Sequence, residues 1–271
     1  MGQWLSERLG QPFIIENRPG AGSNLAAAAV VAALPDGQTL LWVTGANATS
    51  ATAYDNLSFN FIRDIAPVAA IVRTTFIMVA NPSVPARTVP EFIAYAKANP
   101  GKINIAAGGY GTAIHLIGEL FKMMTGVDIV YVQYHGDAPA LTDLVGGRVQ
   151  VMFAGSAVLD LIRAGKLQPL GVTTATRYEA LPDVPPIGDF VPGYEASGWQ
   201  GLGAPKNTPA KIVDTLNKEV NAGLANQKLM AQFANLGGAV LSGSPADFGK
   251  LIADETDKWA KVIKFAGIKA E

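Results

Sequence analysis

The 271-residue chain contains no cysteine, which excludes disulfides, thiolate nucleophiles and cysteine-ligated metal sites. It contains only two histidines, and no third ligand residue accompanies either of them at a spacing typical of a metal site. We therefore expect no bound metal.

An excess of basic residues is also absent, because 21 Lys and Arg stand against 22 Asp and Glu. Proteins that bind a nucleic-acid backbone or an anionic membrane need such an excess, so no nucleic acid is expected as a partner. The longest apolar run, residues 25–34, has about ten residues, whereas a membrane-spanning helix needs about twenty. Met1 is followed by a polar stretch without a basic start or an apolar core, so no signal peptide is visible. Taken alone, this start indicates a cytoplasmic protein.

The motifs of several enzyme classes are missing as well. Ile114 and Leu25 stand where the dinucleotide fingerprints beginning at Gly109 and Gly20 would need their third glycine. No phosphate-binding loop ends in Gly-Lys-Ser or Gly-Lys-Thr, and no Gly-x-Ser-x-Gly nucleophile elbow occurs. We therefore expect no cofactor and no catalytic residues.

What the chain does contain is an alternation of short apolar strands and amphipathic helices, which predicts an α/β fold with mixed, mostly parallel sheets flanked by helices. Apolar residues make up 49% of the chain, enough for one large or two modest domains with a real core. The spacing predicts strands at 13–16, 39–43, 103–105, 130–134 and 149–153, an extended stretch at 198–203, and helices at 23–34, from 88, at 114–121, from 208 and from 244.

Four loops at strand ends combine glycine with small polar residues. Ligands of open α/β sheets lie outside the carboxyl ends of the strands, and a helix N-terminus offers unpaired N–H groups to an anion. The alternative is that these loops only turn the chain and that Thr112 only caps its helix. The ligand-binding residues predicted on this basis are Thr44, Gly45, Asn47, Gly108, Gly109, Gly111, Thr112, His115, Gly136, Asp137 and Ser156.

His115 lies four residues before Glu119 in one helix. This pair could ligate a metal or form an acid–base couple, or it could be a structural contact that steadies the helix. His135 is interpreted as a loop residue. Arg18 could bind a ligand carboxylate or could anchor the turn in which it lies. Tyr110 and Trp199 could stack on a ligand or could pack inside the protein.

Six motifs together resemble a known family in the same order along the whole chain. They are ENRPGAG (16–22), PDGQTL (35–40), GTAIHLIGELF (111–121), APALTDL (138–144), AGKL (164–167) and LPDVP (181–185). The family is that of the substrate-binding receptors of tripartite tricarboxylate transporters, also called Bug receptors.

The resemblance implies a two-lobed periplasmic binding protein of type II-like, Venus flytrap architecture. Lobe one would hold 1–80 and 201–271, lobe two would hold 81–200, and the hinges would lie near 79–82 and 198–203. Such a receptor captures a small organic carboxylate in an interlobe cleft and delivers it to membrane transporter subunits. The resemblance therefore implies a periplasmic, monomeric binding protein and no enzyme.

Three departures from the family pattern affect these expectations. Members normally begin with a signal peptide, a strand and a Gly-Gly-x-x-Asp-type ligand loop, whereas this chain begins inside the following helix, so lobe one would be truncated. Asp137 replaces a small neutral residue, and would disfavour a second ligand carboxylate and favour an amine or hydroxyl. Many members of the family have a longer polar loop at the position of residues 153–156 of this chain.

Two other readings stay open. One is an enzyme on the same fold that acts on a small organic acid through His115 and Glu119. The other is a ligand-dependent sensor or a degenerate paralogue that has lost its ligand.

Overall fold

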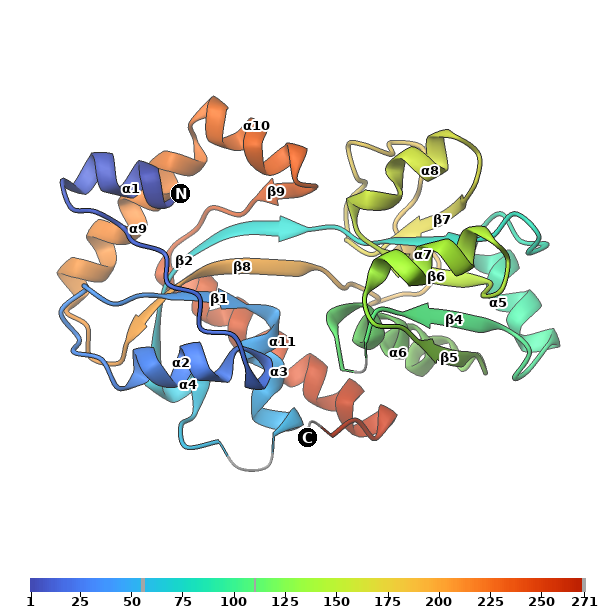
Figure 1. The fold of residues 1–271 in the computed structure, drawn as a ribbon, viewed down its shortest axis with the longest axis horizontal. Helices are drawn as coiled ribbons and strands as arrows, with labels where there is room; N and C mark the ends of the chain where they lie inside the picture. Colours follow the sequence, from blue (N-terminus) through green and yellow to red (C-terminus); the bar gives the residue numbers. More distant parts are fainter. Residues whose placement is uncertain (55–56, 110, 270–271) are drawn as a thin grey trace. The chain divides into compact units, whose positions relative to one another are not determined.

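The structure is a computed structural model that describes residues 1–54, 57–109 and 111–269. The chain forms two compact units (Figure 1). Apart from a few residues at the C-terminus, unit 1 holds Met1–Arg73 and Trp199–Lys264, and unit 2 holds Thr74–Gly198. The assignment of lobes to 1–80 with 201–271 and to 81–200 stays a prediction.

Unit 1 is built on a four-stranded sheet in the order β1-β8-β2-β9. The strands are β1 (Leu41–Thr44), β2 (Ile65–Thr74), β8 (Gly198–Pro205) and β9 (Gly238–Val240), and β1 runs antiparallel to β8. The helices are α1 (Gly2–Leu9), η1 (Ala21–Ser23), α2 (Asn24–Val31), α3 (Gly45–Ala53), α4 (Phe61–Asp64), α9 (Ala210–Leu224), α10 (Gln227–Asn235) and α11 (Pro245–Ala266).

Two apolar clusters form the core of unit 1. One gathers β1 and α11 around Trp199 and Phe248, whose rings meet edge to face at 5.8 Å between centroids. The other joins Leu5 of α1 to Ile71 of β2 and Val220 of α9. Burial of these side chains supplies most of the driving force that holds the helices on the sheet.

Unit 2 is built on a five-stranded sheet in the order β5-β4-β6-β3-β7. The strands are β3 (Ile77–Ala80), β4 (Asn104–Ala107), β5 (Val130–Gln133), β6 (Val151–Ala154) and β7 (Gln168–Val172). β4 pairs parallel with β5 and β6, whereas β3 pairs antiparallel with β6 and β7. The helices are α5 (Val89–Ala98), α6 (Ala113–Thr125), α7 (Asp137–Val145), η2 (Ser156–Val158), α8 (Leu159–Arg163) and η3 (Ile187–Asp189).

The α/β class and the mixed sheets are therefore confirmed, and most of the expected elements are present with shifted ends. The start of α5 is also confirmed, because the Thr88 side chain accepts a hydrogen bond from the Glu91 N–H. An alternation of strands and helices predicts parallel pairing, so it does not predict the antiparallel pairing of β1 with β8 or of β3 with β6 and β7. Among the described residues no helix has the length and apolar character needed to cross a bilayer.

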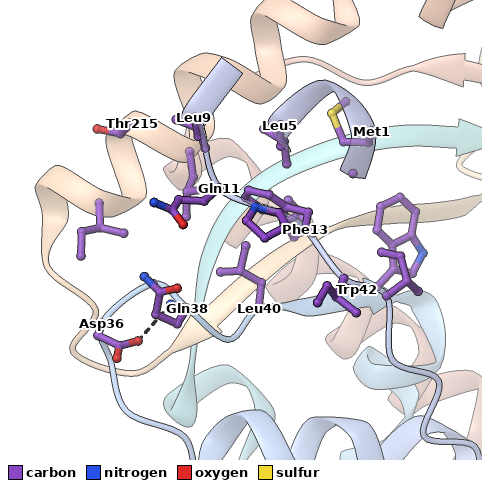
Figure 2. Close-up of a pocket in the computed structure, with 18 of the residues that line it drawn as sticks. Met1, Leu5, Leu9, Gln11, Phe13, Asp36, Gln38, Leu40, Trp42 and Thr215 are labelled. Atoms are coloured by element: carbon purple, nitrogen blue, oxygen red, sulfur yellow. Dashed lines mark hydrogen bonds between the residues drawn. The ribbon is translucent and has the colours of Figure 1, made fainter. Parts of the chain in front are cut away.

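The strand expected at 13–16 is wrong. These residues form an irregular stretch in which Ile14 and Ile15 are 85% and 76% exposed. The stretch and Trp42 of β1 line the same cavity, of about 470 Å³, together with residues of α1 and α9 (Figure 2). Apolar composition favours a strand, but a strand also needs a hydrogen-bonding neighbour, and no ladder to 13–16 occurs in the described part of the chain.

Candidate functional site

Three of the predicted loops gather at one edge of the unit 2 sheet. The segments after β5, β4 and β6 begin with residues 134, 108 and 155, and these three strands are neighbours that run in the same direction. Their carboxyl ends therefore lie side by side, which brings together the glycines at 108–111, Gly136 with Asp137, and Ser156. The loops lead directly into α6, α7 and η2.

Two of these loops touch through their backbones. The Tyr134 N–H donates to the Ala107 carbonyl at 2.9 Å, and the Gly136 N–H donates to the Gly108 carbonyl at 3.2 Å. A Cβ atom added at Gly108 would collide with the carboxylate of Asp137. The Asp137 carboxylate therefore lies beside the loop that follows β4.

Thr112 closes the loop onto α6. Its hydroxyl donates to the Gly109 carbonyl at 2.8 Å and accepts from the His115 N–H at 3.4 Å. The capping role that the sequence left open is therefore present. The side chain is exposed, and the N–H groups of the first turn of α6 have no intrahelical acceptor by geometry.

His115 lies beneath this loop. It is 3% exposed, and its Nδ1 accepts a hydrogen bond from the Gly111 N–H at 3.0 Å. Its Nε2 lies 3.7 Å from Oε1 of Glu119, which is also buried and lies 3.8 Å from Nζ of Lys122. The structural reading of the His115–Glu119 pair is the one that these contacts support.

Sequence reasoning missed Tyr131 of β5 as a partner of this cluster. Its ring meets the His115 imidazole edge to face at 4.6 Å between centroids, and its hydroxyl donates to the His115 carbonyl at 3.5 Å. Burial, with the Glu119 carboxylate as a smaller cause, raises the pKa of the Tyr131 hydroxyl far above its ordinary value, which keeps it neutral. Only the strand–helix packing reveals this contact, because Tyr131 follows His115 by 16 residues.

In unit 1, Thr44, Gly45 and Asn47 lie where β1 runs into α3. The Thr44 N–H donates to Oδ1 of Asn47 at 2.9 Å, so the amide side chain closes the first turn of α3. Asn47 is 1% exposed, and its Nδ2 is buried without a hydrogen-bond partner among the described residues. Whether this loop contacts a ligand stays a prediction.

Other candidates have different surroundings. Arg18 forms an exposed ion pair with Glu16 at 2.8 Å. Trp199 is 1% exposed and donates its Nε1–H to Glu255 at 3.2 Å, so it packs inside unit 1 and does not present a stacking face. His135 is an exposed loop residue, and Tyr110 lies outside the described residues.

No cluster of His, Asp or Glu suited to a metal ion occurs within the described ranges. The cavity of unit 1 shown in Figure 2 contains none of the predicted ligand residues. Its lining is mainly apolar and includes the charged side chains of Glu16, Asp36 and Lys211. The loops of unit 2 gather most of the predicted ligand residues and are therefore the better candidate site.

The family described as "Tripartite tricarboxylate transporter family receptor" matches residues 1–268 of this chain. Protein BugT of Bordetella pertussis (strain Tohama I) is 32% identical over 273 residues, which cover 99% of this chain and 84% of BugT. A protein of Pseudomonas sp. (strain P51), named for the tcbD-tcbE intergenic region, is 32% identical over 96% of this chain and 78% of its own length.

Solved structures of periplasmic binding proteins are also similar to this chain over almost its whole length. R. palustris Rpa4515, solved with adipate, is 37% identical with a TM-score of 0.80, over 99% of this chain and 91% of that one. MatC (Rpa3494) from Rhodopseudomonas palustris, solved with bound malate, is 29% identical with a TM-score of 0.76, over 97% and 91% of the two chains.

Proposed function

The chain belongs to the tripartite tricarboxylate transporter receptor family, and we propose that it is a receptor that binds a small organic carboxylate outside the cytoplasmic membrane and delivers it to the membrane subunits of such a transporter. The observation that carries this proposal is the convergence of three loops at the carboxyl edge of β5, β4 and β6, two of which open helices. The malate and adipate held by the related structures support a dicarboxylate or hydroxy acid as the ligand class.

The chemistry of these loops suits an anion that must also be released. Backbone N–H groups at the starts of α6 and α7 bring the positive ends of two helix dipoles toward the same edge of the sheet. No cation among the predicted ligand residues adds a fixed charge of opposite sign. Neutral donors hold a carboxylate without the strong attraction of a buried ion pair, as a transport receptor requires.

The enzyme alternative has no observation in its favour. His115 accepts a backbone hydrogen bond at Nδ1 and is almost fully buried, so it has little access to a substrate proton. The predicted ligand contacts from Thr44, Gly45 and Asn47 remain part of the proposal, as do a monomeric state and a periplasmic location.

Thermal melts of the purified chain with a panel of carboxylates test this function. A ligand that binds only the folded state raises the Tm, and at about 100 times the Kd it adds roughly 2.7 kcal/mol to the free energy of unfolding. We expect a shift with malate, adipate or a related acid, and none with the matched amide or alcohol. A cooperative melt that no carboxylate shifts would contradict a functional receptor and favour the ligand-free paralogue.

Asp137 gives a sharper prediction about ligand choice. The exposed carboxylate lies beside Gly108 at the start of α7, so it repels a second carboxylate on the ligand. We expect Asp137→Ser to bind adipate about tenfold more tightly than the unchanged chain, by calorimetric titration. Asp160→Ser, which removes an exposed carboxylate at the start of α8, is the control. An unchanged ratio of affinities for adipate and its monoamide would refute this role.

A further inference from the structure

The loop that follows β5 is tied to the helix that it opens by a tyrosine side chain. Tyr134 is the first residue after β5, and its hydroxyl donates to Oδ2 of Asp143 in α7 at 2.9 Å. The other carboxylate oxygen, Oδ1, accepts from Nη1 of Arg148 at 2.9 Å, and the Arg148 N–H donates to the Asp143 carbonyl at 3.0 Å. Both carboxylate oxygens are therefore engaged, which fixes the direction in which Asp143 presents its acceptor to Tyr134.

The Tyr134–Asp143 hydrogen bond connects points on either side of the loop 134–136. Asp143 lies more than one turn beyond Asp137, the first residue of α7, so the tyrosine side chain reaches past the start of the helix and does not merely cap it. The loop backbone is separately hydrogen-bonded to β4 and to the segment that follows β4. The direction of α7 is thus fixed at two places, by the backbone of the loop and by the hydroxyl of Tyr134.

The packing and the charge state of the pair favour a lasting contact. The Tyr134 ring is half-buried and packs against the apolar cluster of unit 2 that contains Ala140 and Leu144 of α7. Partial burial, followed by the hydrogen bond to Asp143, raises the pKa of the Tyr134 hydroxyl. The hydrogen bonds from Tyr134 and then from Arg148 lower the pKa of the Asp143 carboxyl. At neutral pH the donor therefore keeps its proton and the acceptor keeps its charge.

We propose that Tyr134 and Asp143 are positioning residues, which touch no ligand themselves but hold the loop 134–136 and the start of α7 in the conformation that binds the ligand. The proposal rests on the function proposed above for this edge of the sheet. Asp143 belongs to the motif at 138–144, and this contact gives that motif a role. The start of α7 carries both unpaired N–H groups and the Asp137 carboxylate, so a small rotation of the helix would move donors and charge together.

Calorimetric titration with adipate and with malate at pH 7 tests this role on the unchanged chain and on a set of variants. Tyr134→Phe keeps the packed ring and removes only the hydroxyl. Asp143→Ala removes the acceptor, whereas Asp143→Asn removes the charge but keeps an oxygen that accepts from the tyrosine. The double variant Tyr134→Phe/Asp143→Ala removes both partners. Tyr178→Phe is the matched control, because Tyr178 packs against the same apolar cluster.

We expect Tyr134→Phe and Asp143→Ala each to raise the Kd about fivefold, and the double variant to raise it no further, because both changes remove the same hydrogen bond. Asp143→Asn and Tyr178→Phe should bind as the unchanged chain does. The Tm should change little, since the Arg148 side chain is 78% exposed and an exposed ion pair adds little stability. An unchanged Kd in Tyr134→Phe, or a double variant in which the two effects multiply, would overturn the proposal.

A measurement without ligand separates this inference from the receptor function. In ¹⁵N NMR spectra of the folded chain, the Gly136 and Asp137 amides should shift in Asp143→Ala, although the substituted residue is more than a helical turn away, and should keep their positions in Asp143→Asn. If no carboxylate binds yet these shifts occur, the receptor function fails and the positioning contact stands. If carboxylates bind all variants equally and the two amides do not shift, the inference fails and the receptor function stands.

Discussion

Thr112 and Asn47 both use a side-chain oxygen to close the first turn of a helix that follows a strand. Thr112 accepts from the His115 N–H, and Asn47 accepts from the Thr44 N–H. The donors left for an anion are the backbone N–H groups at the helix starts and Nδ2 of Asn47, which has no hydrogen-bond partner among the described residues. At the residue scale, the side-chain oxygens of Thr112 and Asn47 therefore fix loop geometry and are not themselves donors to a ligand.

Some of this could be predicted from the sequence, and some could not. The caps at Thr88 and Thr112 follow from local spacing, because the partner N–H lies three residues further on. The acceptor role of His115 could not be predicted, because it depends on the positive φ of Gly111 and on Tyr131 from another element. Sequence spacing shows that two residues share a helix face but does not show what either nitrogen of a ring contacts.

The start of α11 yields a prediction about acid stability. Asp247 accepts from the Ser244 hydroxyl and the Ser244 N–H, and these bonds, the hydroxyl first, lower the pKa of its carboxyl. A lowered pKa in the folded state gives stability that is present above about pH 4 and is lost as the pH falls below it.

We therefore expect Asp247→Ala to lower the free energy of unfolding at pH 7 and to lower it less at pH 3, measured by urea unfolding. Asp257→Ala, at an exposed position of the same helix, is the control. An equal loss at both pH values would show that the Asp247 charge does not contribute.

At the scale of elements, β8 has a tight packing requirement at Gly201. Gly201 is buried in β8, and a Cβ atom there would collide with the Ala69 carbonyl of β2 and the Phe248 ring of α11. Glycine therefore allows α11 to approach the sheet closely. The sequence indicated only an extended Gly-rich stretch at 198–203, and the reason for glycine appears once the neighbours are known.

We expect Gly201→Ala to destabilise the protein by about 1–3 kcal/mol, because an extra methyl group in a packed core forces its neighbours apart. Gly155→Ala is the matched control, since a Cβ atom there meets open space and its φ of −76° suits alanine. Urea unfolding of both variants checks this. A Gly201→Ala variant as stable as Gly155→Ala would contradict the packing account.

Strand prediction succeeded where a segment has neighbours and failed where it has none. The expected strands at 103–105 and 149–153 correspond to β4 and β6, which pair with each other and with a further strand on the other side. Residues 13–16 have equally apolar character, but they line a cavity and form no ladder in the described part of the chain. Composition indicates whether a segment favours the strand conformation, but whether it pairs with another strand depends on the rest of the fold.

At the scale of the whole molecule, the chain forms two compact units with their own sheets and cores. Periodicity alone predicted the α/β class, and the expectation of a two-lobed protein came only from the family resemblance. The reason is physical, because a domain boundary depends on which distant segments pack together. Unit 1 takes its strands from both ends of the chain, and local sequence periodicity does not show that these distant segments share a sheet.

The central claim is that the loops after β5, β4 and β6 bind a carboxylate, and ¹⁵N NMR titration of the purified chain with adipate and malate tests it most directly. The account predicts that the largest amide shifts occur at Gly108, Gly109, Thr112, Asp137 and Ser156. Shifts concentrated at Phe13, Leu40 and Trp42 would place the ligand in the cavity of unit 1 instead. That result, or a spectrum that neither acid changes, would contradict the account.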